Sequence, residues 1–174
     1  MKKYLAIMCV AGVAFAANAS VVWDEGVDGD LSDDALNNAT VLDLSMGSNN
    51  VIGNIGGSGI DFVDGMEITI GAGETLSSVT LVDFVVSGGN TATLFNVFDA
   101  STAFLGSVSM TTGDIGSDLL ALSGINTLGP GTFIIEMREG IPNQNYEISY
   151  NLIPAPASMA LLGLGGLVAS RRRR

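Results

Sequence analysis

The side chains of this chain that could do chemistry are mainly carboxylates, and they are densest in the segment Trp23–Asp34, which reads WDEGVDGDLSDD. Its acids are Asp24, Glu25, Asp28, Asp30, Asp33 and Asp34. Carboxylates at short, glycine-separated spacing suit Ca²⁺, which binds several oxygen ligands in loose geometry. We expect Asp28 and Asp30, on either side of Gly29, to be the ligands. The alternative is a solvated acidic arm, because no glutamate closes the segment as in a helix–loop–helix calcium loop.

The composition argues against catalysis. The chain has no histidine, and its one cysteine is Cys9, which leaves no means to build a Ser–His or Cys–His nucleophile or a His-ligated zinc site. A glycosidase-type pair of carboxylates stays open among the eighteen acids, although none lies in a recognisable motif. We therefore predict that the protein is not an enzyme and uses no cofactor apart from the Ca²⁺ considered above.

Three aromatic side chains are candidates for a sugar-stacking platform: Trp23, Tyr146 and Tyr150. Rigid aromatic rings with polar tips suit contact with carbohydrate. The two tyrosines share the apolar face of their segment with Ile148, so the alternative places them in the core. Trp23 is followed directly by acids, and we expect it to be the more exposed ring.

The last twenty-two residues combine three features in a fixed order. The stiff, extended Pro154-Ala155-Pro156 comes first, because proline fixes φ and disfavours a helical residue before it. The uncharged run Ala157–Ser170 follows, and the chain ends in Arg171, Arg172, Arg173 and Arg174. A helix over that run spans about 21 Å of a roughly 30 Å hydrocarbon core, and snorkelling arginines would close part of the gap. This order predicts a membrane-targeting tail with its arginines on the cytoplasmic side; a buried core helix with a basic end is the alternative.

This tail resembles the PEP-CTERM sorting signal of Gram-negative bacteria, which joins a short proline motif, a hydrophobic helix and an arginine cluster. Ala155 stands where the family usually has glutamate, and Ala157 and Ser158 continue the usual pattern. The resemblance implies processing by an exosortase-like membrane enzyme. It also implies an inner-membrane stage anchored by the C-terminus, followed by delivery to the cell surface or the extracellular matrix.

The N-terminal segment Met1–Ala19 predicts a signal peptide. Lys2 and Lys3 precede an apolar run, and Ala17-Asn18-Ala19 forms a small-residue cleavage site. Cleavage by signal peptidase would leave Ser20 as the new N-terminus and would remove Cys9. An uncleaved N-terminal anchor helix is the alternative, which the shortness of the apolar run disfavours.

The segment between these ends, Ser20–Leu152, is expected to form one domain. It holds all eighteen acids and a single basic residue, Arg138, which gives it a net charge of −17. Nucleic acids and anionic lipids need basic surfaces, so we exclude them as partners of this segment. Its charge favours divalent cations, cationic polymers and solubility.

Short apolar runs separated by Gly, Asn, Asp and Ser predict an all-β body, an antiparallel β-sandwich or jelly roll of about eight or nine strands. The expected strands are Thr40–Leu44, Asn50–Ile55, Asp61–Ile70, Leu76–Ser87, Thr91–Asp99, Phe104–Met110, Thr132–Arg138 and Asn145–Leu152. The first two are expected to pair with each other, and Gly88-Gly89-Asn90 to form a hairpin turn between the fourth and fifth. A change of face near Leu81 predicts a bulge. Thr112–Ser123 is ambiguous, with leucines that could cap the core from a loop or a short helical turn.

Several marks of this body resemble the bacterial pre-peptidase C-terminal domain, a β-sandwich of secreted proteins. They are Gly47-Ser48-Asn49-Asn50, Asp61-Phe62-Val63-Asp64, Gly129-Pro130-Gly131-Thr132-Phe133 and Asn145-Tyr146-Glu147-Ile148. The sequence as a whole therefore predicts an exported, non-enzymatic surface or matrix protein. The alternative is a carbohydrate-binding module that acts on exopolysaccharide, with Ca²⁺ assisting.

Overall fold

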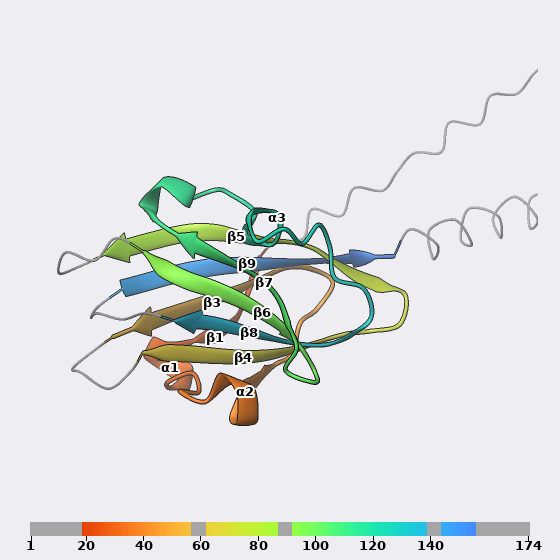
Figure 1. Cartoon of the computed structure of the whole chain (residues 1–174), viewed down its shortest axis with the longest axis horizontal. Coiled ribbons are helices and arrows are strands. Elements are labelled where there is room, and N and C mark those ends of the chain that lie inside the picture. The colour runs from red at the N-terminus through yellow and green to blue at the C-terminus, as the bar shows by residue number, and fades with distance from the viewer. Residues whose placement is uncertain (1–18, 57–61, 87–91, 139–143, 156–174) are drawn as a thin grey trace, which may run out of the picture.

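A computed structural model describes residues 19–56, 62–86, 92–138 and 144–155 of the chain (Figure 1). These residues form nine strands in two sheets that pack against each other around one main core. The all-β class and the strand number are therefore confirmed for the described part. The predicted signal helix and the C-terminal helix Ala157–Ser170 lie outside the described residues. Within them, no helix is long and apolar enough to span a membrane.

The two sheets contain four and five strands. The four-stranded sheet has the order β1 (Ser20–Asp24), β3 (Gly47–Ile55), β9 (Gln144–Pro154) and β5 (Glu74–Val86). The five-stranded sheet has the order β2 (Thr40–Leu42), β4 (Val63–Ile70), β8 (Gly131–Arg138), β6 (Thr93–Asp99) and β7 (Phe104–Met110). The short helices are α1 (Glu25–Asp28), α2 (Ala35–Asn38), the 3-10 helix η1 (Thr112–Asp114) and α3 (Leu119–Leu122).

The prediction of a purely antiparallel arrangement is wrong for two edge strands. β1 pairs with β3 in parallel, and β2 pairs with β4 in parallel. Parallel neighbours need a crossover between them rather than a tight turn. The chain provides the crossover by alternating between the two sheets from β1 to β6. The strand between each parallel pair therefore belongs to the opposite sheet.

The same alternation contradicts two predicted strand pairings. The strand at Thr40–Leu42 and the strand at Gly47–Ile55 lie in different sheets, and so do β5 and β6. Gly88-Gly89-Asn90 lies outside the described residues, but it joins strands that are not hydrogen-bonded neighbours. Among the described strands, β6 and β7 are neighbours both in sequence and in a sheet.

Strand β9 has the regular alternation that its sequence predicts. Tyr146, Ile148, Tyr150 and Leu152 are all buried, and the strand pairs with β3 on one side and β5 on the other. It is longer than predicted, because Ile153 and Pro154 continue the ladder opposite Thr75 and Glu74.

Strand β4 differs from its predicted face. Phe62 was expected beside Met66, Ile68 and Ile70, but it precedes the strand and is 41% exposed. The residue that shares the buried face with them is Asp64, which is fully buried. A search for alternating apolar residues misses this position because aspartate is polar, although its spacing of two residues from Met66 fits one face of a strand.

The predicted bulge in β5 is confirmed. The register shifts between Leu81 and Asp83, which leaves Val82 exposed and returns Phe84 to the core. The ambiguous segment ends in α3, where Leu119 and Leu120 are buried and Leu122 is exposed. Its leucines therefore cap the core from a short helical turn, which is one of the two predicted alternatives.

Candidate functional site

The acid-rich segment after β1 is folded by its own carboxylates. Asp24 caps α1, where its side chain accepts a hydrogen bond from the Gly26 amide (2.9 Å), and Asp28 Oδ2 accepts one from the Asp24 amide (2.9 Å). Asp34 caps α2 through the Asn37 amide and side chain. Side-chain oxygens at such positions satisfy helix donors that have no partner within the helix. Much of the predicted acidic arm is therefore ordered local structure.

Glu25 joins this segment to the four-stranded sheet. Its Oε1 accepts a hydrogen bond from the Leu31 amide (2.9 Å), and its Oε2 accepts one from the Asn54 amide in β3 (2.5 Å). Charge-assisted bonds of this kind are stronger than those between neutral groups. The carboxylate thus fixes the path of the chain from β1 toward α2.

Two acids of this segment and one from β4 meet beside this contact. Carboxylate oxygens of Glu25, Asp30 and Asp64 all lie within 4.8 Å of one another, and we call these residues the carboxylate cluster. Asp64 is fully buried, and its Oδ2 accepts a hydrogen bond from the Tyr146 hydroxyl (2.7 Å). Burial raises the pKa of Tyr146 well above its ordinary value, and the negative charges of Asp64 and Glu25 raise it further. The phenol therefore remains a proton donor.

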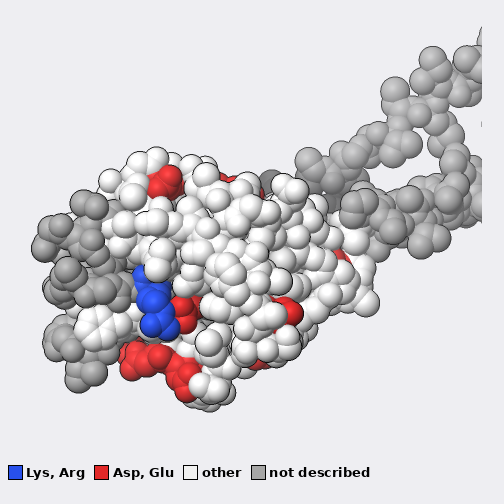
Figure 2. All heavy atoms as spheres, viewed as in Figure 1, with Lys and Arg blue, Asp and Glu red and all other residues white. Residues whose placement is uncertain are grey.

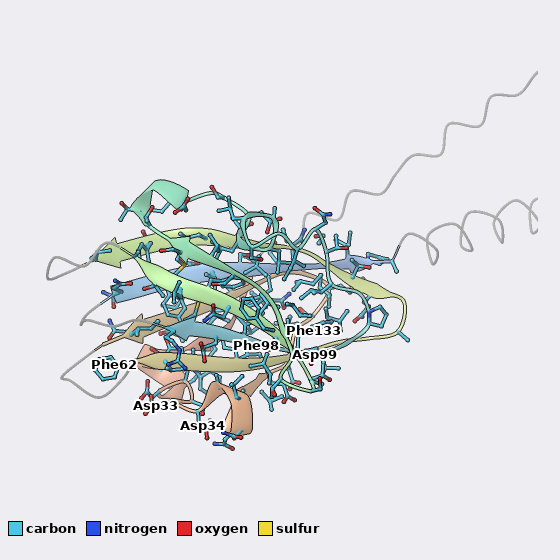
Figure 3. The ribbon with its side chains drawn as sticks, viewed as in Figure 1. Asp33, Asp34, Phe62, Phe98, Asp99 and Phe133 are labelled. Carbon is cyan, nitrogen blue, oxygen red and sulfur yellow. The ribbon has the colours of Figure 1, made fainter. Side chains whose placement is uncertain are left out.

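The cluster contains one of the two predicted ligands. Asp30 belongs to it, whereas Asp28 is outside it and accepts a hydrogen bond from the Asp24 amide. Asp33 and Asp34 lie by α2, outside it (Figure 3). Sequence reasoning missed Glu25 and Asp64 as members; for Asp64, the signal was a carboxylate in register with the buried residues of its strand.

Three carboxylates at this separation repel one another unless a cation or a proton lies between them. Oxygen-only ligands are those that Ca²⁺ prefers, and Asp30 is exposed, so the cluster is open on one side. Two of its members already bind groups of the protein itself. The arrangement can hold a hard cation at the junction of the two sheets.

The aromatic platform predicted from the sequence does not form. Tyr146 and Tyr150 are buried, as their core alternative predicted. Trp23 is only partly exposed; it packs against the main core, and its indole N–H donates to the Gly29 carbonyl (3.0 Å). Trp23 is therefore the most exposed of the three rings, as expected, but it is not free of the body.

A different surface combines polar and aromatic groups, on the outer face of the five-stranded sheet. Arg138 binds Glu136 through both Nε and Nη2 (2.8 and 2.9 Å), and Asn96 donates to the same carboxylate (2.9 Å). Glu136 is only 3% exposed. Its burial opposes ionisation, but the hydrogen bonds from Arg138 and Asn96 outweigh it and lower the pKa of Glu136. Figure 2 shows this face with one blue patch, and Arg138 is the only Lys or Arg among the described residues.

Apolar side chains flank this pair along the same face. Phe104 is 60% exposed and meets Phe98 edge to face, with 5.7 Å between ring centroids. Leu94, which pairs with Arg138 across β6 and β8, is also exposed. Phe98 lies at one end of this face and Phe62 at the other (Figure 3). This strip offers hydrogen-bonding groups between exposed apolar side chains.

The predicted processing residues lie at the two limits of the described body. Ala19 is exposed, and Ser20 begins β1. Pro154 pairs with Glu74, and the Ala155 amide donates to the Gly73 carbonyl (2.7 Å), so the proline motif begins on the sheet itself. The remaining predicted processing residues, Ala17, Pro156, Ala157, Ser158 and Arg171–Arg174, lie outside the described residues.

Comparison of the chain with known protein families returns no matching family model, and comparison with curated proteins returns no match.

If the carboxylate cluster holds Ca²⁺, saturating Ca²⁺ should raise the melting temperature of the mature chain by about 5 °C, the shift expected for a ligand well above its dissociation constant. Asp30→Asn should abolish the increase, because it removes an exposed ligand and leaves the core unchanged. Thermal melts in Ca²⁺, Mg²⁺ and chelator measure this, and Asp33→Asn is the matched control. A melting temperature that does not respond to Ca²⁺ would contradict a calcium site at this cluster.

Proposed function

We propose that this protein is an exported, non-enzymatic component of the cell surface or extracellular matrix, sorted by its C-terminal tail. The observation that carries the proposal is the arrangement of the chain: a signal-peptide pattern, an acidic β-sandwich and a tripartite tail follow one another without a gap. Signal peptidase and an exosortase-like enzyme are the processing partners that this order requires. The tail is the part that contacts the membrane.

The junction between body and tail supports this proposal. The last hydrogen bond of the described body is made by Ala155, and the hydrophobic run begins at Ala157. Two residues extend over at most about 7 Å, so a tail in the bilayer would hold the body against the membrane surface or the processing enzyme. The described sheet thus overlaps the proposed sorting motif at Pro154 and Ala155.

The arrangement of the strands indicates which end of the tethered body would face the membrane. Ser20 pairs with Asn49, and Asn49 pairs with Tyr150, so β1 begins near the end of β9 (Figure 1). Both predicted processing points therefore lie at one end of the sandwich. The opposite end, which carries α1 and Arg138, would face away from the membrane.

The carboxylates also support a non-enzymatic role. Glu25 and Asp64 in the cluster, and Glu136 on the outer face, accept hydrogen bonds from the protein's own amides or side chains. A glycosidase pair needs two carboxyl groups that reach a substrate, one of them free to give up a proton. These three act instead as internal hydrogen-bond acceptors.

The second candidate function is binding of exopolysaccharide, and the outer face of the five-stranded sheet favours it. Aromatic rings beside fixed hydrogen-bonding groups are suited to sugars, which present both C–H faces and hydroxyl groups. Phe104 supplies the ring, and the exposed guanidinium of Arg138, held in place by the buried Glu136, supplies the hydrogen-bonding group. The proposed site therefore differs from the one predicted around Trp23.

Deletion of residues 156–174 tests the sorting function. It leaves Pro154 opposite Glu74 and keeps the Ala155–Gly73 hydrogen bond, so the body should fold with an unchanged circular dichroism spectrum. We expect the membrane-associated fraction to fall by about tenfold or more, because the apolar run that binds lipid is gone. Fractionation of cells expressing the full chain and the deletion measures it; replacing Arg171–Arg174 with serines isolates the role of the charges. An unchanged distribution of the deletion variant would refute the proposal.

Phe104→Ala tests the second function. We expect it to weaken binding of the purified body to exopolysaccharide by about fivefold, as loss of one aromatic contact predicts. Val85→Ala is the control, since Val85 is also exposed but lies on β5 in the other sheet. Binding would be measured by affinity electrophoresis in the polysaccharide. Equal affinity of both variants and the parent chain would exclude this face as the binding site.

A further inference from the structure

A buried threonine and a buried glutamine connect the two sheets. Thr93 begins β6 in the five-stranded sheet and is 1% exposed, and Gln144 begins β9 in the four-stranded sheet and is fully buried. The Thr93 hydroxyl donates a hydrogen bond to Oε1 of the Gln144 carboxamide. The hydroxyl and the carboxamide are thus in direct contact inside the sandwich.

The nitrogen of the Gln144 carboxamide is a buried hydrogen-bond donor that no described residue satisfies. Gln144 Nε2 is buried and finds no hydrogen-bond partner in the described part of the chain. Buried amide donors are nearly always satisfied, because an unsatisfied one loses its bonds to water without replacing them. The carbonyl oxygen of the group is bound while its nitrogen is left unsatisfied.

We propose that Thr93 and Gln144 become joined by an intramolecular ester. Thr93 Oγ1 forms a bond to Gln144 Cδ, the Cδ–Nε2 bond breaks, and the hydroxyl proton moves to the nitrogen, which leaves as ammonia. One hydroxyl and one carboxamide give one ester and one ammonia. The reaction needs no oxidant, cofactor or second substrate.

Three features of the site favour this reaction. Two groups held in contact react as if at very high concentration, with effective molarities of about 10⁵ M or more in well-oriented cases. Burial keeps out the water that would hydrolyse the ester. Release of ammonia also removes the unsatisfied donor from the core.

The cross-link would serve an exported β-sandwich that has no disulfide. The chain's one cysteine, Cys9, lies in the predicted signal peptide. The ester would tie β6 to β9 and so link the two sheets at the end opposite the tail. A covalent tie between distant residues restricts the unfolded chain in the way a disulfide does. The inference stands on this contact and does not depend on the sorting function.

Intact-mass spectrometry of the purified, folded protein tests the proposal. We expect a mass about 17 Da below that of the sequence, the mass of one ammonia. Thr93→Val should restore the full calculated mass, whereas Thr93→Ser, which keeps a hydroxyl, should retain the deficit. This pair of variants separates the ester from a succinimide at an asparagine, which also loses ammonia but does not depend on Thr93.

Peptide mapping keeps the test decisive if Thr93→Val does not fold. Cleavage after acidic residues would release Phe84–Asp99 and Gly140–Glu147 from the parent chain. We expect these two peptides as one cross-linked species that hydroxylamine separates. Recovery of both as separate linear peptides, together with a full intact mass for the folded parent chain, would overturn the proposal.

Discussion

The structure depends on strand β9, whose inward side chains must all be buried between two sheets. It pairs with β3 and β5 on its two sides, and its alternation places Tyr146, Ile148 and Tyr150 in the core. The two tyrosine hydroxyls donate hydrogen bonds to the opposite sheet: Tyr146 to the Asp64 carboxylate and Tyr150 to Met66 Sδ. Because buried polar groups need partners, these contacts fix where β4 lies over β9. The same strand continues to Pro154, so the first residue of the proline motif belongs to the sheet.

The sequence predicted the strands of this fold better than their partners. A period of two marks a half-buried strand locally, and it identified β9, β8 and β7 with few errors at their ends. It carries no information about which strand lies beside which. The chain inserts β8 between β4 and β6 and inserts β9 between β3 and β5, so most neighbours are distant in sequence. The predicted hairpins failed for that reason, since they assumed that strands adjacent in sequence are adjacent in the sheet.

The candidate site could be predicted only where its chemistry was local. Asp30 was found because it stands in a dense run of acids, but its neighbour Asp64 comes from strand β4. The hydrogen-bond partner of Asp64, Tyr146, is a further 82 residues along the chain. Tyr146 and Tyr150 were ambiguous because an aromatic ring with a polar tip suits both a surface and a satisfied core. The outer face around Arg138 was not predicted at all, since Glu136 and Asn96 meet only through the pairing of β6 with β8. The two terminal segments, in contrast, were predicted from the local order of their residues alone, and the proposed function rests on them.

We propose that the acidic body leaves the cytoplasm and is processed at both of its ends. Mapping both termini of the protein recovered from the cell envelope and the surrounding medium by mass spectrometry tests this most directly. The account predicts that the chain begins at Ser20 and ends between Pro154 and the arginine cluster, with the β-sandwich intact between them. Recovery of a chain from Met1 to Arg174, confined to the cytoplasm, would contradict it.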